Sequence, residues 1–231
     1  MNKKMNFENY SMKKEMIKLA KGNDRIILTN LSFKNDEDVN KLLAKNVNTP
    51  FEVLYSFYKD NKYLNILEKN FSFTKYRELT KDENFLNLNQ IERESIVKMS
   101  RLINEGKDLD EKICSSFIKI NYKPLVEEIA FYEKTPIKIL EKLSKNEDIT
   151  IRNKVALNKS STPGILVNLI NDEKLFIRYN VAQHPNSTSE ILYKLAEDED
   201  EVVRNKAINH KNYSYNLLER LIDINEFEVE F

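Results

Sequence analysis

Three arginines that could bind a charged ligand recur at a fixed interval in the sequence. Arg152, Arg178 and Arg204 are spaced by 26 in the numbering. Guanidinium groups at a regular spacing could bind phosphates or the carboxylates of an acidic peptide. Asp148 precedes Arg152 by four residues, and Asp200 precedes Arg204 by four, which favours ion pairs within a helix. We therefore expect this arginine column chiefly to hold the fold and to tie neighbouring units together.

The two histidines follow the same interval. His184 and His210 are spaced like the arginines, and Asn158 occupies the same position one interval earlier. Two adjacent imidazoles could bind a metal ion or transfer a proton. Because asparagine fills the position as well, we interpret it as a hydrogen-bonding position at a turn, and we predict no metal site and no cofactor.

Cys114 is the only cysteine, so a disulfide within the chain and a cysteine-based metal site are excluded. It follows Ile113 and lies three residues before Phe117, on the apolar face of an expected helix. A nucleophilic thiol would need a histidine nearby, and both histidines are distant in the sequence. We predict that Cys114 is a small buried hydrophobic residue.

The acidic residues do not form a catalytic pattern. The run from Glu197 to Glu201 could attract a basic partner or a loosely bound cation, but its spacing does not fit a calcium loop, and we predict a solvated turn. Glu94 and Asp110 lie outside any recognisable catalytic motif, and no glycine-rich phosphate loop or serine elbow occurs. We predict no catalytic residue, with a hydrolase or transferase as the least favoured alternative.

Aromatic residues are concentrated between Phe51 and Tyr63. Phe51, Tyr55 and Tyr58 share one face of an expected helix. Core packing is the default interpretation, and an exposed aromatic groove for a peptide is the alternative. The basic segment from Lys3 to Lys21 is expected to be a capping helix, with a helix on a membrane surface as the alternative.

The elements that must position these residues are short helices in pairs. Leucines recur at the interval of the arginines in two registers, at 140, 166, 192 and 218 and at 143, 169, 195 and 221. A turn signal such as Thr135-Pro136 precedes each first helix, and acidic residues precede each second helix. One such pair cannot bury its own apolar face, so neighbouring pairs must stack.

This repeat predicts an all-α fold, a right-handed α-solenoid of short helical pairs. We expect one continuous solenoid over residues 1–231, with diverged repeats at 12–83, regular repeats at 124–226 and a tail at 227–231. Residues 84–123 break the register and are either an insertion or strongly diverged repeats. Within them we expect one helix from Gln90 to Glu105, a stop at Gly106 and a second helix from Leu109 to Ile120.

The repeated pattern Val/Ile-Arg-x-x-Val-Ala-x-Asn/His-Pro-x-Thr-Pro, followed by Leu-x-x-Leu and an acidic turn, resembles the variant leucine-rich repeat, a family similar in style to HEAT repeats. Residues 177–188 match it best, 151–163 less fully and 203–214 least. The resemblance implies a right-handed superhelix and a scaffold that binds proteins, and it implies no reaction. Some HEAT-like relatives bind DNA. The cysteine cluster that serves an iron–sulfur centre in one member of the family does not occur here.

Composition narrows the choice of function. The chain has 37 basic and 37 acidic residues, 3 glycines and 5 prolines, which suits a helical protein without the basic excess of a dedicated DNA-coating protein. No apolar run is long enough to span a membrane, and we expect a cytoplasmic protein. We predict a non-enzymatic scaffold that binds a protein or peptide on its concave surface. The alternative is a HEAT-like nucleic-acid-binding protein or a protein similar to a DNA repair glycosylase.

Overall fold

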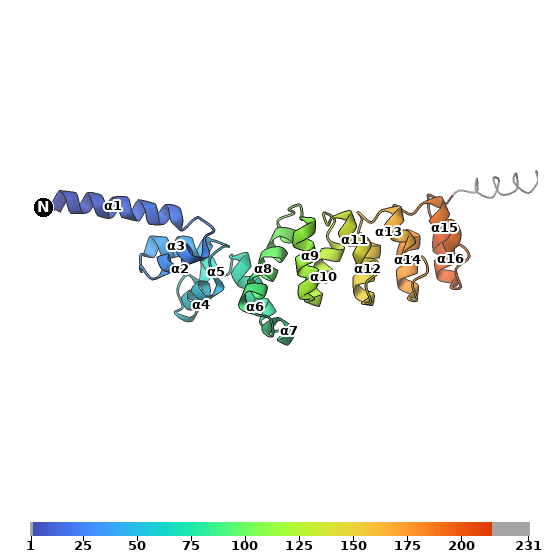
Figure 1. The fold of residues 1–231 in the computed structure, drawn as a ribbon, viewed down its shortest axis with the longest axis horizontal. Coiled ribbons are helices and arrows are strands. Elements are labelled where there is room, and N and C mark those ends of the chain that lie inside the picture. Colours follow the sequence, from blue (N-terminus) through green and yellow to red (C-terminus); the bar gives the residue numbers. More distant parts are fainter. Residues whose placement is uncertain (1, 214–231) are drawn as a thin grey trace, which may run out of the picture. The chain divides into compact units, whose positions relative to one another are not determined.

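The structure, a computed structural model, describes residues 2–213, and these form sixteen helices and no strand (Figure 1). This confirms the all-α class. The chain divides into two compact units, residues 1–101 (unit 1) and residues 102–231 (unit 2). The expected single solenoid over residues 1–231 stays a prediction, and the tail at 227–231 lies outside the described residues.

The helices of unit 1 vary in length from one turn to five. They are α1 (Asn2–Leu19), α2 (Arg25–Ser32), α3 (Glu37–Lys45), α4 (Phe51–Lys59), α5 (Leu64–Leu67), α6 (Phe71–Leu79), α7 (Glu83–Leu86) and most of α8 (Gln90–Asn104). Those of unit 2 are α9 (Glu111–Ile120), α10 (Lys123–Phe131), α11 (Ile137–Leu143), α12 (Ile149–Leu157), α13 (Pro163–Val167), α14 (Leu175–Gln183), α15 (Ser189–Leu195) and α16 (Glu201–Ile208).

Unit 2 repeats one helix pair. The first helices α9, α11, α13 and α15 contact one another in sequence, and so do the second helices α10, α12, α14 and α16 (Figure 1). Successive second helices contact each other more extensively than successive first helices. The predicted leucines of α11, α13 and α15 are buried, whereas Leu218 and Leu221 lie outside the described residues.

The segment that breaks the sequence register contains one more first helix. The helix α9 begins one full repeat interval before α11 and contacts it as α11 contacts α13. Cys114 and Phe117 therefore occupy the positions of Leu140 and Leu143, and both are buried. Cysteine and phenylalanine in place of leucine explain why the leucine pattern of the sequence does not extend to α9.

The long helix before this repeat ends as predicted. Gly106 has a φ of +67°, a conformation that side chains other than glycine rarely adopt. Its amide donates to the Ile103 carbonyl, and the Lys107 amide donates to the Leu102 carbonyl, each at 3.0 Å. These bonds satisfy the last carbonyls of α8 and stop the helix.

The hydroxyl groups before the first helices differ from the expected caps. The N-cap residues of α11, α13 and α15 are Pro136, Thr162 and Thr188, and none makes a side-chain cap hydrogen bond. The preceding hydroxyls instead donate to the carbonyl six residues earlier, with distances of 2.6 Å from Thr135, 2.7 Å from Ser161 and 2.6 Å from Ser187. They close the turn between a second helix and the next first helix.

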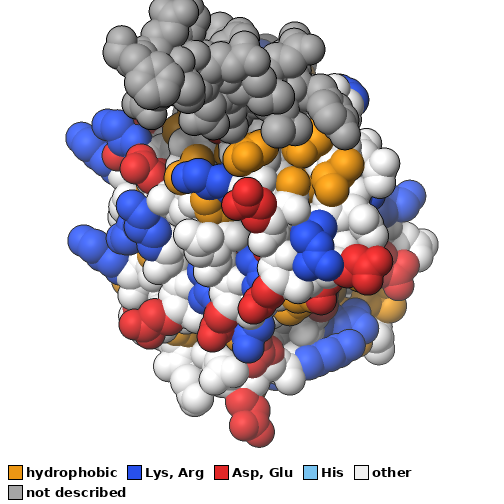
Figure 2. All heavy atoms as spheres, turned by 90° about the vertical axis from the view of Figure 1, so that its right-hand side faces the viewer, with side chains coloured by type: hydrophobic (Ala, Val, Ile, Leu, Met, Phe, Trp, Pro, Cys, Tyr) orange, Lys and Arg blue, Asp and Glu red, His pale blue; other side chains and the backbone are white. Residues whose placement is uncertain are grey.

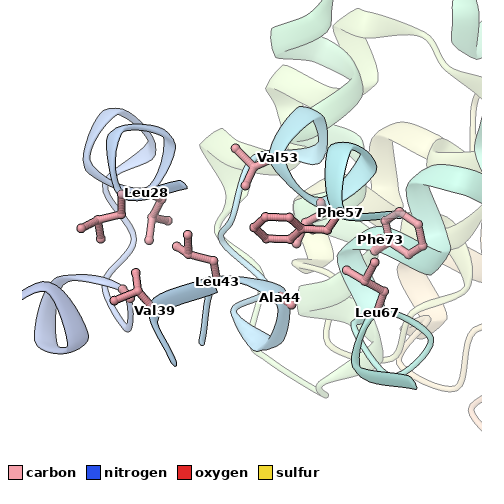
Figure 3. Close-up of a cluster of buried hydrophobic side chains, with 11 residues drawn as sticks. Leu28, Val39, Leu43, Ala44, Val53, Phe57, Leu67 and Phe73 are labelled. Carbon is pink, nitrogen blue, oxygen red and sulfur yellow. The ribbon is translucent and has the colours of Figure 1, made fainter. Parts of the chain in front are cut away.

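Unit 1 encloses its own apolar core. Buried side chains from α2 to α6 meet in one cluster that includes Leu28, Leu43, Phe57, Leu67 and Phe73 (Figure 3). Partly buried side chains of α1, including Met16 and Ile17, pack against it. This packing agrees with a capping role for the C-terminal part of α1.

Unit 1 uses the same turn as unit 2. Thr49 donates to the carbonyl of Leu43, six residues earlier, at 2.8 Å. The Asn46 amide nitrogen donates to the carbonyls of Ala20 and Gly22, at 2.9 and 2.7 Å. The Asn70 amide does the same one interval later, with Ala44 and Asn46 as acceptors. The interval between these two asparagines is slightly shorter than that of unit 2, and the diverged repeats expected over residues 12–83 stay a prediction.

Candidate functional site

Two members of the arginine column, Arg152 and Arg178, bind carboxylates of the following repeat. Nε and Nη2 of Arg178 donate to the two carboxylate oxygens of Asp198, at 2.7 and 3.0 Å, and Nη1 donates to the Asp172 carbonyl at 2.8 Å. Arg152 binds Asp172 in the same bidentate way, at 2.6 and 3.2 Å. Both arginines thus tie one second helix to the turn that starts the next.

The expected partners of these arginines were wrong. Asp148 pairs with Lys123 at 2.7 Å rather than with Arg152, and Asp200 accepts the Val202 amide as an N-cap. Arg204 donates to the carbonyls of Asp198 and Glu199. Hydrogen bonds from Lys123 and Thr150 lower the pKa of Asp148 to about 2. The ion pairs tie one repeat to the next, because the arginines point along the stack and not along their own helix.

Asp172 and Asp198 stay ionised although they are buried. Burial alone would raise their pKa values, but hydrogen bonds from Arg152 and Arg178 and from the amides of Lys174 and Asp200 lower both pKa values below the ordinary range. Asp198 corrects the prediction for the run from Glu197 to Glu201, since its side chain is buried and paired within an otherwise solvated turn.

The histidine column is a hydrogen-bonding position, as its asparagine member suggested. The Asn158 amide nitrogen donates to the carbonyls of Ala130 and Tyr132, both at 2.9 Å. Nε2 of His184 lies 2.9 Å from the Asn158 carbonyl, and Nδ1 accepts the Asn186 amide at 3.1 Å. This arrangement requires the neutral imidazole with its proton on Nε2, and burial lowers the pKa of His184 and of His210.

The remaining predicted residues are placed as follows. Burial raises the pKa of the Cys114 thiol to about 11, with a smaller effect of Asp110, so the thiolate is disfavoured. Asp110 caps α9 through the amides of Lys112 and Ile113. Glu94 forms an ion pair with Arg25. The described residues contain no group of three metal-binding side chains and no helix able to span a membrane.

The aromatic residues of α4 form a stack with those of α6. The Phe51 ring lies 3.7 Å from that of Tyr76 and 5.3 Å from that of Tyr55, measured between centroids. Tyr58 packs on Phe73 and is covered by Arg77. Tyr55 keeps about a third of its surface exposed, with a relative accessibility of 37%. The stack is mainly packing, the default interpretation of Tyr55 and Tyr58.

One exposed surface of unit 2 is both periodic and uncommitted to the core. We define the second-helix face as the outward side of α10, α12, α14 and α16. Large apolar side chains exposed on it are Phe131, Leu157, Phe176 and Val202. Two lysines lie over aromatic rings of the preceding repeat, Lys154 over Phe131 and Lys206 over Tyr179, each at 5.1 Å from the centroid.

Side-chain amides lie among these apolar groups. The Asn180 amide donates to the Asn153 oxygen at 2.7 Å, and the Gln183 amide donates to the Asn180 oxygen at 2.8 Å. The face therefore alternates apolar, cationic and amide groups along the stack. Sequence reasoning missed it because these side chains differ in type between repeats, whereas the invariant positions of the pattern hold the fold.

No protein-family model, curated protein or solved structure matches this chain.

Proposed function

We propose that this chain is an α-solenoid of repeats similar to the variant leucine-rich repeat, and that it binds a protein or peptide along the second-helix face without catalysing a reaction. The observation that carries the proposal is the exposure of four large apolar side chains at successive second helices. Clustered exposed apolar side chains on a soluble surface are typical of interaction sites.

The contrast with the invariant positions supports this assignment. The side chains of the arginine, histidine and serine columns make hydrogen bonds between or within repeats. These bonds account for the recurrence of the three residue types. Phe131 lies beneath the Lys154 ammonium, and all four apolar side chains of the second-helix face stay 37–57% exposed. Side-chain amides next to apolar groups suit an extended peptide, since a carboxamide can both donate to and accept from a peptide bond.

The packing of the two helix rows supports placing this face on the concave side. Successive second helices contact each other more extensively than successive first helices. In a curved stack the inner row is the more crowded one, so the second helices would line the inside. A partner on that side could contact several repeats at once.

Charge favours a protein partner over a nucleic acid. Acidic and basic side chains intermingle on the end of unit 2 that carries α15 and α16, without a patch of one sign (Figure 2). The second-helix face adds Glu127 and Glu128 to Lys154 and Lys206. A duplex would require a more uniform positive surface for phosphate neutralisation.

The proposal is tested by selecting peptides from a random display library on the purified full chain. The variant Phe131→Ser/Phe176→Ser/Val202→Ser removes three of the four large apolar groups of the second-helix face. The matched control is Ile113→Ser/Ile137→Ser/Val167→Ser, which removes equally exposed apolar groups from first helices. We expect the selected peptides to lose about tenfold or more in affinity for the first variant, corresponding to about 1.4 kcal/mol, and to bind the control normally.

Circular dichroism establishes that both variants are folded. Peptides that bind the two variants equally, or a library that yields no binder, would contradict the proposal. Binding of duplex DNA that weakens steeply with salt and is unaffected by the three substitutions would favour the nucleic-acid alternative.

A further inference from the structure

Unit 1 contains a cavity of about 640 Å³ that the repeat pattern does not explain. Its walls come from the start of α2, the turn before α4 with the start of α4, α6, and α8 from Ile91 to Arg101. Cavities of this size commonly hold small organic molecules. The residues around it indicate what kind of molecule fits.

Among the side chains that line the cavity, cations outnumber carboxylates, although the whole chain is neutral and Arg25 also pairs with Glu52 at 3.3 Å. Three cationic side chains line it, Arg25, Lys98 and Arg101, against one carboxylate, Glu94. Glu94 is already paired with Arg25. Among residues 10–213, whose side chains the structure describes, Lys98 forms no ion pair, so its ammonium group is available to a ligand. An anion is the complementary occupant.

The buried Arg101 is held in place by an asparagine at the cavity wall. Nη1 and Nη2 of Arg101 both donate to the Asn48 side-chain oxygen, at 3.1 and 3.2 Å. The Asn48 backbone amide in turn donates to the Asn46 side chain, which is bound to the carbonyls of Ala20 and Gly22. The guanidinium is thus fixed before any ligand arrives, which reduces the entropy lost on binding.

Asn48 departs from the rule that its counterparts follow. In unit 2 the residue two positions after the asparagine or histidine binds carbonyls of the preceding repeat, as seen for Ser160, Asn186 and Asn212. Asn48 uses its oxygen for Arg101 instead. Its amide nitrogen donates no hydrogen bond to any described residue, which leaves a donor at the cavity wall beside the guanidinium.

Part of the cavity wall is apolar. Phe51 lines it and is stacked on Tyr76, while Ile91 contributes a largely exposed side chain from the first turn of α8. A ligand that fills the cavity must therefore combine an anionic group with an apolar body.

We propose that this cavity binds a small organic anion, with its phosphate or carboxylate group at Lys98, Arg101 and Asn48 and its apolar part against Phe51 and Ile91. The site is separate from the second-helix face, and it does not depend on the proposed partner binding. Phosphate and carboxylate share the same recognition chemistry at a guanidinium and an ammonium.

The proposal is tested by calorimetric titration of the full chain with phenyl phosphate, benzoate and inorganic phosphate. We expect one saturable site for phenyl phosphate or benzoate, and the tighter of the two identifies the preferred anionic group. Inorganic phosphate should bind more weakly than phenyl phosphate because it lacks the apolar part. Lys98→Glu should lower the affinity by about tenfold or more, since it replaces attraction with repulsion at the anion.

Lys34→Glu is the matched control, since Lys34 is exposed in unit 1 and lies outside the cavity. It should leave the affinity unchanged. The proposal is overturned if neither aromatic probe saturates at millimolar concentration, or if the two variants weaken binding equally, which would indicate general attraction. Capture of a polyglutamate peptide through Lys98 without binding of either small probe would also overturn it.

Discussion

The two units use the same turn but hold their repeats together with different side chains. In both, an asparagine or histidine reaches back to carbonyls of the preceding repeat, as Asn70 does in unit 1 and Asn158 in unit 2. Among the described residues, only unit 2 adds the arginine–aspartate pair at this turn. At the position of Arg152, unit 1 has Asn40, while Asp60 occupies the position of Asp172. Unit 1 thus has the acid without the arginine.

The difference shows which of the two interactions, the hydrogen bonds to carbonyls or the arginine–aspartate ion pair, the turn requires. Hydrogen bonds to carbonyls at a helix end are needed wherever the turn is buried, because an unpaired carbonyl there is costly. The ion pair is an addition that the turn can omit. In unit 1 the stack of Phe51, Tyr55 and Tyr76 supplies contact area instead, and Asn40 is left with a buried side-chain oxygen that has no hydrogen-bond partner among the described residues.

The largest expected effect comes from breaking the ion pair of unit 2. Arg178→Met leaves Asp198 buried without its partner, so we expect a loss of about 3–5 kcal/mol in the free energy of unfolding, measured by urea titration with circular dichroism. Arg204→Met should cost about 1 kcal/mol, since among the residues that the structure describes Arg204 binds only carbonyls.

The double variant Arg178→Met/Asp198→Leu removes both charges. It should recover most of the loss, because an apolar pair of similar volume can replace a buried ion pair. Equal losses for Arg178→Met and Arg204→Met would show that the Arg178–Asp198 ion pair stabilises unit 2 no more than the hydrogen bonds of Arg204 to carbonyls do.

The sequence predicted the helical class and the spacing of unit 2 because leucine and arginine recur there without change. It also placed α8, Gly106 and the histidine position correctly, because helix periodicity and a shared Asn/His position are local signals. It assigned the wrong carboxylates to the arginines, since a spacing of four residues also fits a pair within a helix. Asp172 lies 20 residues from Arg152, and only stacking brings the two together.

The second-largest expected loss of stability concerns the asparagine hydrogen bonds to backbone carbonyls that both units share. Asn70→Leu removes the donor to the carbonyls of Ala44 and Asn46 and the acceptor for the Phe73 amide. We expect a loss of about 2–3 kcal/mol in the free energy of unfolding, since these buried groups would lose their partners. Asn158→Leu should cost a similar amount in unit 2. A negligible loss at either position would mean that the tie is not common to both units.

A gain in stability is expected at the position where unit 1 lacks the arginine. Asn40→Leu removes a buried oxygen without a partner and replaces it with a side chain of similar size, so the free energy of unfolding should rise by about 1 kcal/mol. Thermal unfolding followed by circular dichroism measures the change. A decrease would show that the Asn40 amide makes a contribution greater than the cost of its buried oxygen.

The cavity of unit 1 had no counterpart in the sequence analysis. Arg25, Asn48 and Arg101 are far apart in the chain and follow no motif, and their convergence depends on how α8 packs against the turn before α4. The useful signal was structural: Asn48 occupies a repeat position whose counterparts bind backbone carbonyls, and it does something else. In this chain the candidate cavity was therefore indicated by a residue that departs from the repeated hydrogen-bond pattern, and not by the invariant columns.

The smallest effect concerns the choice of histidine over asparagine in the shared tie. Burial lowers the pKa of His184 below 6.5, so the neutral form is favoured in the folded state. Protonation would place an N–H at Nδ1 against the Asn186 amide. Between about pH 7 and the lowered pKa the unfolded chain binds more protons, so the stability contributed by neutral His184 is present at higher pH and is lost as the pH falls.

His184→Asn restores the residue of the preceding repeat and removes this titration. At pH 7 the free energy of unfolding should change by less than about 1 kcal/mol, because asparagine can donate to the preceding repeat and accept the Asn186 amide as Asn158 does with its own neighbours. Between pH 7 and 5 the variant should lose less stability than the wild type. The paired carboxylates Asp172 and Asp198 do not interfere, because their lowered pKa values place their titration below this range. If the free energy of unfolding changed equally with pH in the two proteins, the protonation state of His184 would have no effect on its contribution to stability.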